Sequence, residues 1–142
     1  MLAPADMLCF ALYSAGHAMQ AAYQPLLQPL GLTYPQYLVV SVLHDRDGVS
    51  VGAIGSALHL DGSTLTPLLK RMEAAGWIRR QRDPRDERRV IVTLTEEGRA
   101  LGESAAHVPE CFIARTGMGP EEMVRLRDTL FALRDQMRKD RG

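Results

Sequence analysis

The sequence predicts a mainly α-helical (α+β) fold, in which amphipathic helices surround one short β-hairpin. Apolar residues recur at steps of three and four residues along most of the chain, which is the period of a helix. Only the stretch from Trp77 to Leu94 instead has the pattern of two strands joined by a polar loop. The 142 residues, 46% apolar and 24% charged, suffice for one folded domain and leave little room for a second core.

The overall composition excludes several classes of protein. The 17 Lys and Arg residues offset 17 Asp and Glu residues, and only 6% of the chain is aromatic, which argues against a stacking platform for single-stranded nucleic acid. No apolar run reaches about 18 residues and no signal-peptide pattern is evident, so we expect no membrane contact. Two cysteines are too few for a disulfide scaffold, and with the four histidines they lack the spacing of zinc ligands. We therefore expect a cytoplasmic protein without a metal or other cofactor.

The first half of the chain predicts two helices followed by a helix-turn-helix. Pro25 and Pro29 are expected to bend or end the first helix. Thr33 and Gln36 have the spacing of a capping box, so a second helix is expected to begin there. Ser50 is expected to cap a third helix that ends at residue 58, and Asp61, after a tight turn, a fourth that runs to about residue 75.

The second half predicts a basic hairpin and two further helices. Strands are expected over 77–82 and 88–94, around a polar tip of five residues. Thr95 is expected to cap a fifth helix that Pro109 kinks, and a sixth helix is expected to open at Gly119. Its apolar residues follow the 4-3-4 spacing of a coiled-coil seam, namely Leu126, Leu130, Leu133 and Met137.

A helix-turn-helix followed directly by a basic hairpin is a winged helix, and we place it at residues 33–95 of a single-domain chain, 1–142. The helices over 1–32 and 96–142 do not belong to that small unit. Their long apolar faces need a partner, and a second copy of the chain is the simplest one. The sequence therefore predicts a homodimer held together by its terminal helices.

The predicted winged helix carries candidate contacts to double-stranded DNA. Residues 70–89 include eight basic and four acidic residues, which indicates either a polyanion contact or a solvated charged surface. The fourth helix buries an apolar face and projects short polar groups that can reach base edges. A loop arginine can enter a narrow minor groove, held by a bidentate carboxylate, although such a pair is also an ordinary surface salt bridge. The candidate DNA contacts are Ser63, Thr64, Thr66, Pro67, Lys70, Arg71, Asp86 and Arg88.

Cys9 is a candidate reactive thiol near the start of the first helix. Tyr23 lies fourteen residues further on, or roughly 21 Å along a straight helix, so it cannot touch Cys9 of its own chain unless the helix folds back. In an antiparallel dimer of first helices, Tyr23 of the partner could reach Cys9. Tyr34 could join it, and phenol O–H groups stabilise a thiolate, which peroxides oxidise to a sulfenic acid. The alternative is an inert, buried side chain among Leu8 and Phe10.

Five segments that span nearly the whole chain have the sequence of a known family. They are Leu8–Tyr13, Tyr23–Leu27, Leu32–Tyr37, Leu60–Glu73 and Asp86–Gly98. The Asp-x-Arg pattern at Asp86 is typical of the MarR family of winged-helix regulators. The Leu-Cys-Phe segment and Tyr34-Pro35-Gln36-Tyr37 are typical of its organic hydroperoxide resistance regulators (OhrR). The chain therefore resembles that branch.

The resemblance implies a homodimeric repressor that releases an inverted-repeat operator when organic hydroperoxides oxidise it. It implies that Cys9 is the peroxidatic cysteine and that Tyr23 and Tyr34 of the partner subunit bond to it. In the two-cysteine members a second cysteine resolves the sulfenic acid as a disulfide between subunits, and Cys111 falls where that cysteine would lie. Cys111 could instead simply pack beside Phe112.

Two other functions remain open from the sequence. One is a MarR regulator released by a small phenolic or lipophilic ligand in the dimer cleft, with both cysteines incidental. The other is a thiol peroxidase that uses Cys9 and Cys111. No Thr or Arg lies within four residues of Cys9 to activate it as in peroxiredoxins, and the basic hairpin would have no role. We therefore expect a regulator and not an enzyme.

Overall fold

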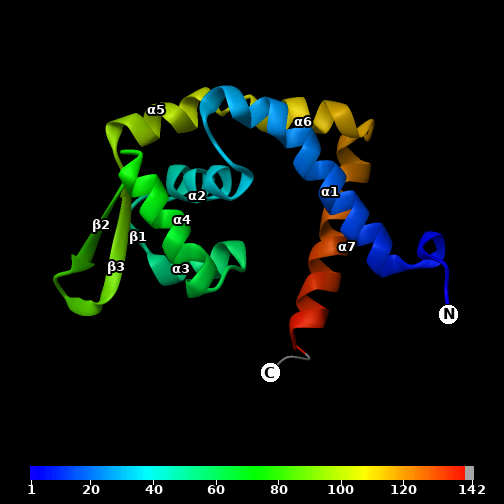
Figure 1. Cartoon of the computed structure of the whole chain (residues 1–142), viewed down its shortest axis with the longest axis horizontal. Coiled ribbons are helices and arrows are strands. Elements are labelled where there is room, and N and C mark those ends of the chain that lie inside the picture. Colours follow the sequence, from blue (N-terminus) through cyan, green and yellow to red (C-terminus); the bar gives the residue numbers. More distant parts are fainter. Residues whose placement is uncertain (140–142) are drawn as a thin grey trace. The chain divides into compact units, whose positions relative to one another are not determined.

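The computed structural model describes residues 1–139 and confirms the mainly helical winged-helix fold (Figure 1). Its helices are α1 (Leu8–Leu27), α2 (Tyr34–Asp45), α3 (Val51–Leu58), α4 (Gly62–Ala74), α5 (Glu96–Ser104), α6 (Val108–Thr116) and α7 (Pro120–Lys139), with 3-10 turns η1 (Pro4–Asp6) and η2 (Gln28–Leu30). Its strands are β1 (Val49–Ser50), β2 (Ile78–Asp83) and β3 (Asp86–Leu94). The chain forms two compact units, residues 1–108 and a C-terminal unit that begins at Pro109.

Polar caps fix the starts of the helices as the sequence predicts. The Gln36 backbone N–H donates to Thr33 Oγ1 at 3.4 Å, and the Thr33 N–H donates to Gln36 Oε1 at 3.0 Å, which completes the capping box of α2. Ser50 Oγ accepts from the Ala53 N–H at the start of α3. Asp61 Oδ1 accepts from the Thr64 N–H at the start of α4.

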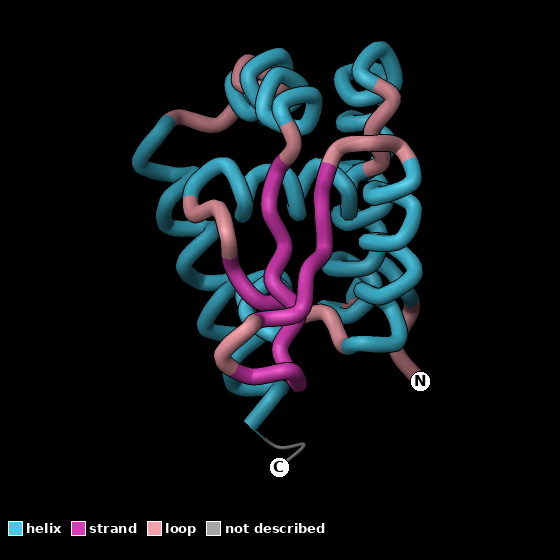
Figure 2. Tube along the Cα trace, turned by 90° about the vertical axis from the view of Figure 1, so that its left-hand side faces the viewer, coloured by secondary structure: helices cyan, strands magenta, loops and turns pink. Residues whose placement is uncertain are grey.

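The sheet has the order β1-β3-β2, and both pairings are antiparallel (Figure 2). Strand β1 is not predicted, because two residues are too short to show a strand period. The predicted five-residue tip is wrong. Since β3 already begins at Asp86, the turn contains only Pro84 and Arg85, and Asp83 Oδ1 accepts from the Arg85 N–H at 2.9 Å.

One of two predictions about prolines needs correction. The predicted kink at Pro109 is a break, because α5 ends at Ser104 and α6 starts at Val108. A proline ring clashes with the carbonyl group four residues earlier, here that of Ala105, which separates the two helices. Pro25 lies inside α1, which continues to Leu27, but the predicted end of the helix at these prolines is found, since Pro29 lies in η2 and Gly31 at φ +71° follows it.

The core of residues 1–108 holds the winged helix together. Leu43 of α2, Ile54 of α3 and Leu69 of α4 are fully buried against Ile78 of β2 and Val92 of β3. Figure 1 shows the hairpin of β2 and β3 beside α4, with its tip pointing away from the helices. No described helix is long and apolar enough to cross a membrane.

Candidate functional site

Helix α4 presents the polar face that the sequence predicts for DNA contact. Leu65, Leu68, Leu69 and Met72 are buried, while Ser63, Thr64, Thr66, Pro67, Lys70 and Arg71 are all exposed. The cap of α4 is tightly bound, since the Ser63 hydroxyl donates to Asp61 Oδ1 at 2.7 Å. This hydrogen bond, with that from Thr64, lowers the pKa of the Asp61 carboxyl, which keeps the cap ionised. The exposed face therefore starts from a rigid turn.

The hairpin presents Arg88 to solvent, with 91% of its side chain exposed. Asp86 holds it, but the predicted bidentate pair is wrong. The Arg88 backbone N–H and Nε both donate to the same oxygen, Asp86 Oδ1, at 3.1 and 3.2 Å. Because the backbone N–H takes part, the guanidinium keeps its other nitrogens free for an acceptor outside the pair. Asp86 thus orients the Arg88 side chain without using all of its hydrogen-bond donors.

A second ion pair connects α4 to the hairpin, and the sequence does not reveal it. The Arg80 backbone N–H donates to Glu73 Oε2 at 2.9 Å, and its guanidinium donates to Glu73 Oε1 at 3.1 Å. The bond to the guanidinium lowers the pKa of the Glu73 carboxyl. Arg80 counts among the clustered basic residues of the sequence, yet its side chain is only 23% exposed. Arg80 therefore has a structural role, in which it joins β2 to α4.

Cys9 lies in the first turn of α1 and is exposed, as are its neighbours Leu8, Phe10 and Tyr13. The burial expected for an inert thiol is therefore not supplied by the single described chain, and the reactivity of Cys9 stays a prediction. Since α1 is one continuous helix to Leu27, Tyr23 of the same chain lies near the other end. Cys111 lies half-buried on α6, in the C-terminal unit.

Tyr23 and Tyr34 belong to a cluster of three phenols that α1 and α2 bring together. The ring centroid of Tyr23 lies 4.9 Å from that of Tyr34 and 5.9 Å from that of Tyr37. Burial, and then Tyr34 and Tyr37, raise the pKa of Tyr23 to about 12, and burial also raises the pKa values of Tyr34 and Tyr37. All three phenols are therefore protonated at neutral pH and can donate hydrogen bonds. Tyr37 lies one turn after Tyr34 and joins the cluster, although the sequence does not predict it as a site residue.

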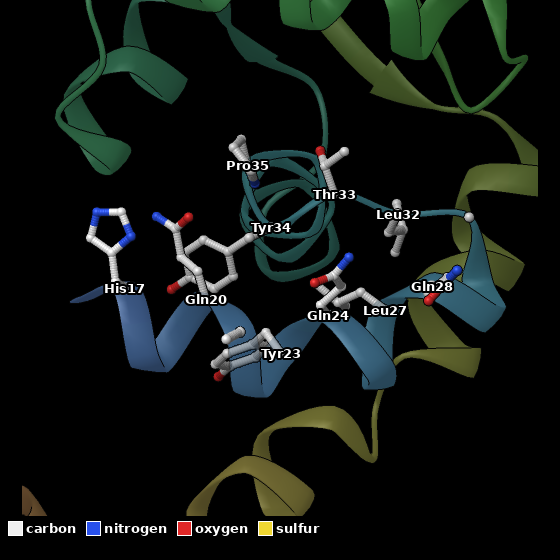
Figure 3. Close-up of a pocket in the computed structure, with 12 residues that line it drawn as sticks. His17, Gln20, Tyr23, Gln24, Leu27, Gln28, Leu32, Thr33, Tyr34 and Pro35 are labelled. Atoms are coloured by element: carbon white, nitrogen blue, oxygen red, sulfur yellow. The ribbon is translucent and has the colours of Figure 1, made fainter. Parts of the chain in front are cut away.

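A cavity of about 630 Å³ opens between α1 and the start of α2. Figure 3 shows Gln20 and Gln24 projecting from α1 towards α2, with the Tyr34 ring between the two helices. Tyr23 also lines the cavity, as does His17 nearer the start of α1. The phenol cluster and the cavity are therefore one site.

Comparisons with known proteins agree with this geometry. The family model for the MarR family matches residues 32–90. The chain is 49% identical over 137 residues to the HTH-type transcriptional regulator TtmR of Methylorubrum extorquens, which covers 96% of the chain and 70% of that protein. It is 41% identical over 128 residues to the organic hydroperoxide resistance transcriptional regulator of Bacillus subtilis, covering 90% of the chain and 87% of that protein.

Solved structures have the same fold. Reduced AbfR bound to DNA superposes with a TM-score of 0.79 at 31% identity, over 94% of this chain and 92% of that one. BpsR of Bordetella bronchiseptica, whose DNA binding is regulated by 6-hydroxynicotinic acid, superposes with a TM-score of 0.86 at 28% identity, over 95% and 98% of the two chains.

Proposed function

The chain belongs to the MarR family of DNA-binding transcriptional regulators, and on that premise we propose that it is a homodimeric repressor that organic hydroperoxides release from DNA by oxidising Cys9. The observation that carries the proposal is the phenol cluster, in which α1 and α2 bring the ring centroids of Tyr23 and Tyr34 to 4.9 Å from each other, and phenols are hydrogen-bond donors at neutral pH. In an antiparallel pair of α1 helices, these phenols reach Cys9 of the partner subunit and stabilise its thiolate. A reducing cytoplasm is the compartment in which such a thiol stays ready to react.

The first chemical step is the attack of the Cys9 thiolate on the terminal oxygen of the hydroperoxide. An S–O bond forms and the O–O bond breaks. The sulfur gives two electrons to the peroxide, and the departing alkoxide takes a proton and leaves as an alcohol. The product is a sulfenic acid, which no longer has the negative charge that the phenols stabilised.

The second step joins Cys9 to Cys111 of the partner subunit. The Cys111 sulfur attacks the sulfenic sulfur, an S–S bond forms, and the hydroxyl leaves as water with the thiol proton. The Cys111→Ser variant is expected to form the sulfenic acid, detectable by dimedone labelling, but no cross-linked dimer on a non-reducing gel. A cross-link that persists in this variant would contradict the role of Cys111.

Release of DNA follows from the spacing of the two α4 helices. In the reduced dimer they fit successive major grooves of an inverted repeat, about 34–36 Å apart. The proposed contacts of each subunit are the exposed residues of α4 together with Asp86 and Arg88 of the hairpin, which inserts into the minor groove. A disulfide that changes the spacing shifts the protein from mostly bound to mostly free if it favours the unbound arrangement by about 5 kcal/mol.

The cavity beside the phenols supports a second candidate, release by a small phenolic or lipophilic ligand with the cysteines incidental. Its volume of about 630 Å³ is within the range of small-molecule sites. Structures similar to this one include BpsR, regulated by 6-hydroxynicotinic acid, and CouR bound to p-coumaroyl-CoA. The relatives and neighbours are transcriptional regulators, so a thiol peroxidase is not retained.

A gel shift on the DNA upstream of the chain's own coding region separates the two candidates. Cumene hydroperoxide is expected to release the wild-type protein, and dithiothreitol to restore binding. Phenolic acids added to the reduced protein are expected to leave the complex intact. Release by a phenolic acid together with indifference to peroxide would replace the proposal with the ligand-regulated alternative.

A further inference from the structure

The carboxylate of Asp47, in the loop between α2 and β1, binds groups from three segments of the chain. Its Oδ1 accepts from the Gly48 N–H and the Leu94 N–H, both at 2.9 Å, and its Oδ2 pairs with an Arg99 guanidinium nitrogen at 3.0 Å. Leu94 is the last residue of β3 and Arg99 lies in the first half of α5. One side chain therefore connects the α2–β1 loop, the base of the hairpin and α5.

The Asp47 carboxylate takes the place of a backbone hydrogen bond that a longer β1 would make to β3. Strand β1 pairs Val49 with Val92 and Ser50 with Ile91, and the same register places Asp47 opposite Leu94. Since β1 contains only two residues, its backbone does not reach that far. The side chain of Asp47 supplies the acceptor for the Leu94 N–H and so extends the hold on β3 to the point where the hairpin leaves the core.

Strand β2 has an anchor of the same kind. Glu73 of α4 accepts from both the backbone and the guanidinium of Arg80, near the base of β2. Each strand of the hairpin is therefore tied at its base by a carboxylate from another element. The remainder of the hairpin, which carries the exposed Arg88, extends beyond these two points (Figure 1).

Small changes at the base of the hairpin are amplified at its tip. Arg88 lies six residues from Leu94, or roughly 20 Å along an extended strand. A tilt of about 10° at Leu94 would move Arg88 by about 3.5 Å at that distance, which is more than the length of a hydrogen bond. The direction of β3 at Leu94 therefore decides whether Arg88 meets a groove.

We infer that Asp47 is a positioning residue for DNA binding: its carboxylate sets the direction of the hairpin, and it acts through Arg88 without touching DNA. This inference rests on the DNA binding of the family and is independent of the redox chemistry of Cys9. The inference also requires that the contacts of Asp47 differ in their importance for the direction of the hairpin. The hydrogen bond to the half-buried Leu94 N–H carries the effect, because the ion pair to Arg99, whose side chain is 54% exposed, is screened by water.

Charge and geometry make opposite predictions for Asp47, which allows a sharp test. Electrostatics alone predicts that any loss of a carboxylate near DNA strengthens binding, because phosphate repulsion falls. The Asp47→Asn variant loses the charge but keeps an amide oxygen in place for the Leu94 N–H. The Asp47→Glu variant keeps the charge, but its extra methylene group displaces the carboxylate. The matched control is Asp45→Asn, because Asp45 has no ion pair or hydrogen bond from its side chain within residues 1–139.

The experiment measures Kd and its salt dependence for each variant on the duplex upstream of the chain's own coding region, with circular dichroism to verify folding. Asp47→Asn and Asp45→Asn are expected to bind within about threefold of the wild type. Asp47→Glu is expected to bind at least tenfold more weakly, with a salt slope smaller by about 1 per subunit, as for the loss of one cationic contact in each subunit.

Hydrogen exchange supplies a readout that does not depend on DNA. The Leu94 amide is expected to exchange faster in folded Asp47→Glu than in the wild type, and at the wild-type rate in Asp47→Asn. Equal DNA binding and equal salt slopes for Asp47→Glu and the wild type would overturn the inference. So would a loss of affinity in Asp47→Asn as large as that in Asp47→Glu, because an acceptor kept for the Leu94 N–H would then not suffice to hold the hairpin in place.

Discussion

Burial opposes ionisation of Tyr23, Tyr34 and Tyr37 and so raises the pKa values of all three phenols. Two phenolates within about 5 Å of each other would also repel, which adds to the effect. A phenol that stays neutral can donate a hydrogen bond to a thiolate, whereas a phenolate can only accept one. Burial therefore extends to more alkaline pH the range in which these phenols can donate hydrogen bonds.

The raised pKa of Tyr23 predicts a loss of stability at alkaline pH. Below pH 10 the phenol is protonated in both the folded and the unfolded chain, so its contribution is fully present. Between pH 10 and the folded pKa of about 12, only the unfolded chain releases the proton, and stability falls by at most about 1.4 kcal/mol per pH unit. Urea unfolding from pH 9 to 11.5 should show a smaller decline in Tyr23→Phe; identical slopes in both proteins would be inconsistent with the burial of this phenol.

Arg88 is the arginine of the hairpin that we propose to reach into the minor groove, and 91% of its side chain is exposed. The Arg88→Ala variant is expected to bind the operator about tenfold more weakly, with a salt slope smaller by about 1 per subunit, because one cation leaves the interface. The control is Arg89→Ala, which removes the same charge from the opposite face of β3 and is expected to change less. Titrations at several salt concentrations measure both; equal slopes for the two variants would remove Arg88 from the minor groove.

Single residues are predictable from the sequence where their partners are local. Thr33, Ser50 and Asp61 bind backbone groups three residues away, so each cap is visible in the spacing alone. The partners of Asp47 lie 47 and 52 residues away, and no local pattern announces them. The Asp86–Arg88 pair shows that even a local contact is predicted only in part. The sequence indicates the pair but not that the Arg88 backbone N–H shares the carboxylate with the guanidinium.

At the scale of elements, α5 is located by two close approaches that require glycine. A Cβ atom on Gly98 would overlap the Trp77 carbonyl oxygen, and one on Gly102 would overlap the His44 ring of α2. The order and type of the elements follow from apolar periodicity and caps. The break between α5 and α6 and the existence of β1 depend on tertiary packing, and so the sequence does not show them.

The contact between α2 and α5 can be tested with a double-mutant cycle. Gly102→Ala is expected to destabilise the fold by about 1–3 kcal/mol through overpacking against His44. His44→Ala should make room, so the double variant is expected to recover most of that loss. Gly52→Ala is the control, because its Cβ would lie 3.9 Å from Ser50 Oγ, an ordinary contact. Urea unfolding midpoints measure the stability of the wild type and of each variant. Additive losses in the double variant would mean that the two residues do not touch.

At the scale of the whole molecule, two helices leave large apolar side chains exposed on the single chain. Leu8, Phe10 and Tyr13 do so at the start of α1, and Leu126, Leu130 and Met137 do so on α7. Three of the four residues with the 4-3-4 spacing predicted for α7 are thus exposed on the described chain, and the fourth, Leu133, is half-buried. We propose that a second copy covers this apolar stripe, in agreement with the expected roles of residues 1–32 and 96–142.

Dimerisation through α7 predicts a clear effect of charge on the stripe. Leu130→Glu is expected to shift the protein from dimer to monomer at micromolar concentration, because a buried, unpaired carboxylate is costly. Ala132→Glu adds the same charge about 200° around the helix and is expected to leave the dimer intact. Analytical ultracentrifugation distinguishes the species; a monomeric wild type, or a dimeric Leu130→Glu, would move the interface elsewhere.

The sequence indicates the DNA-binding half of the function more fully than the sensing half. Residues for α4 and the hairpin lie within one short segment, where helix period and charge place them on one surface. The sensing site instead needs residues from α1 and α2, and in our proposal from two subunits, so that spacing along one chain leaves its assembly open. The phenol cluster within one chain supplies half of that site.

The most direct test of the account is the response of Cys9→Ser to organic hydroperoxide on operator DNA. This variant keeps the phenol cluster, α4 and the hairpin, and is expected to bind as tightly as the reduced wild type. With cumene hydroperoxide the wild type should dissociate, while Cys9→Ser should stay bound at every peroxide concentration that leaves the DNA intact. Dissociation of Cys9→Ser at the same peroxide concentration as the wild type would contradict the proposal that Cys9 is the sensor.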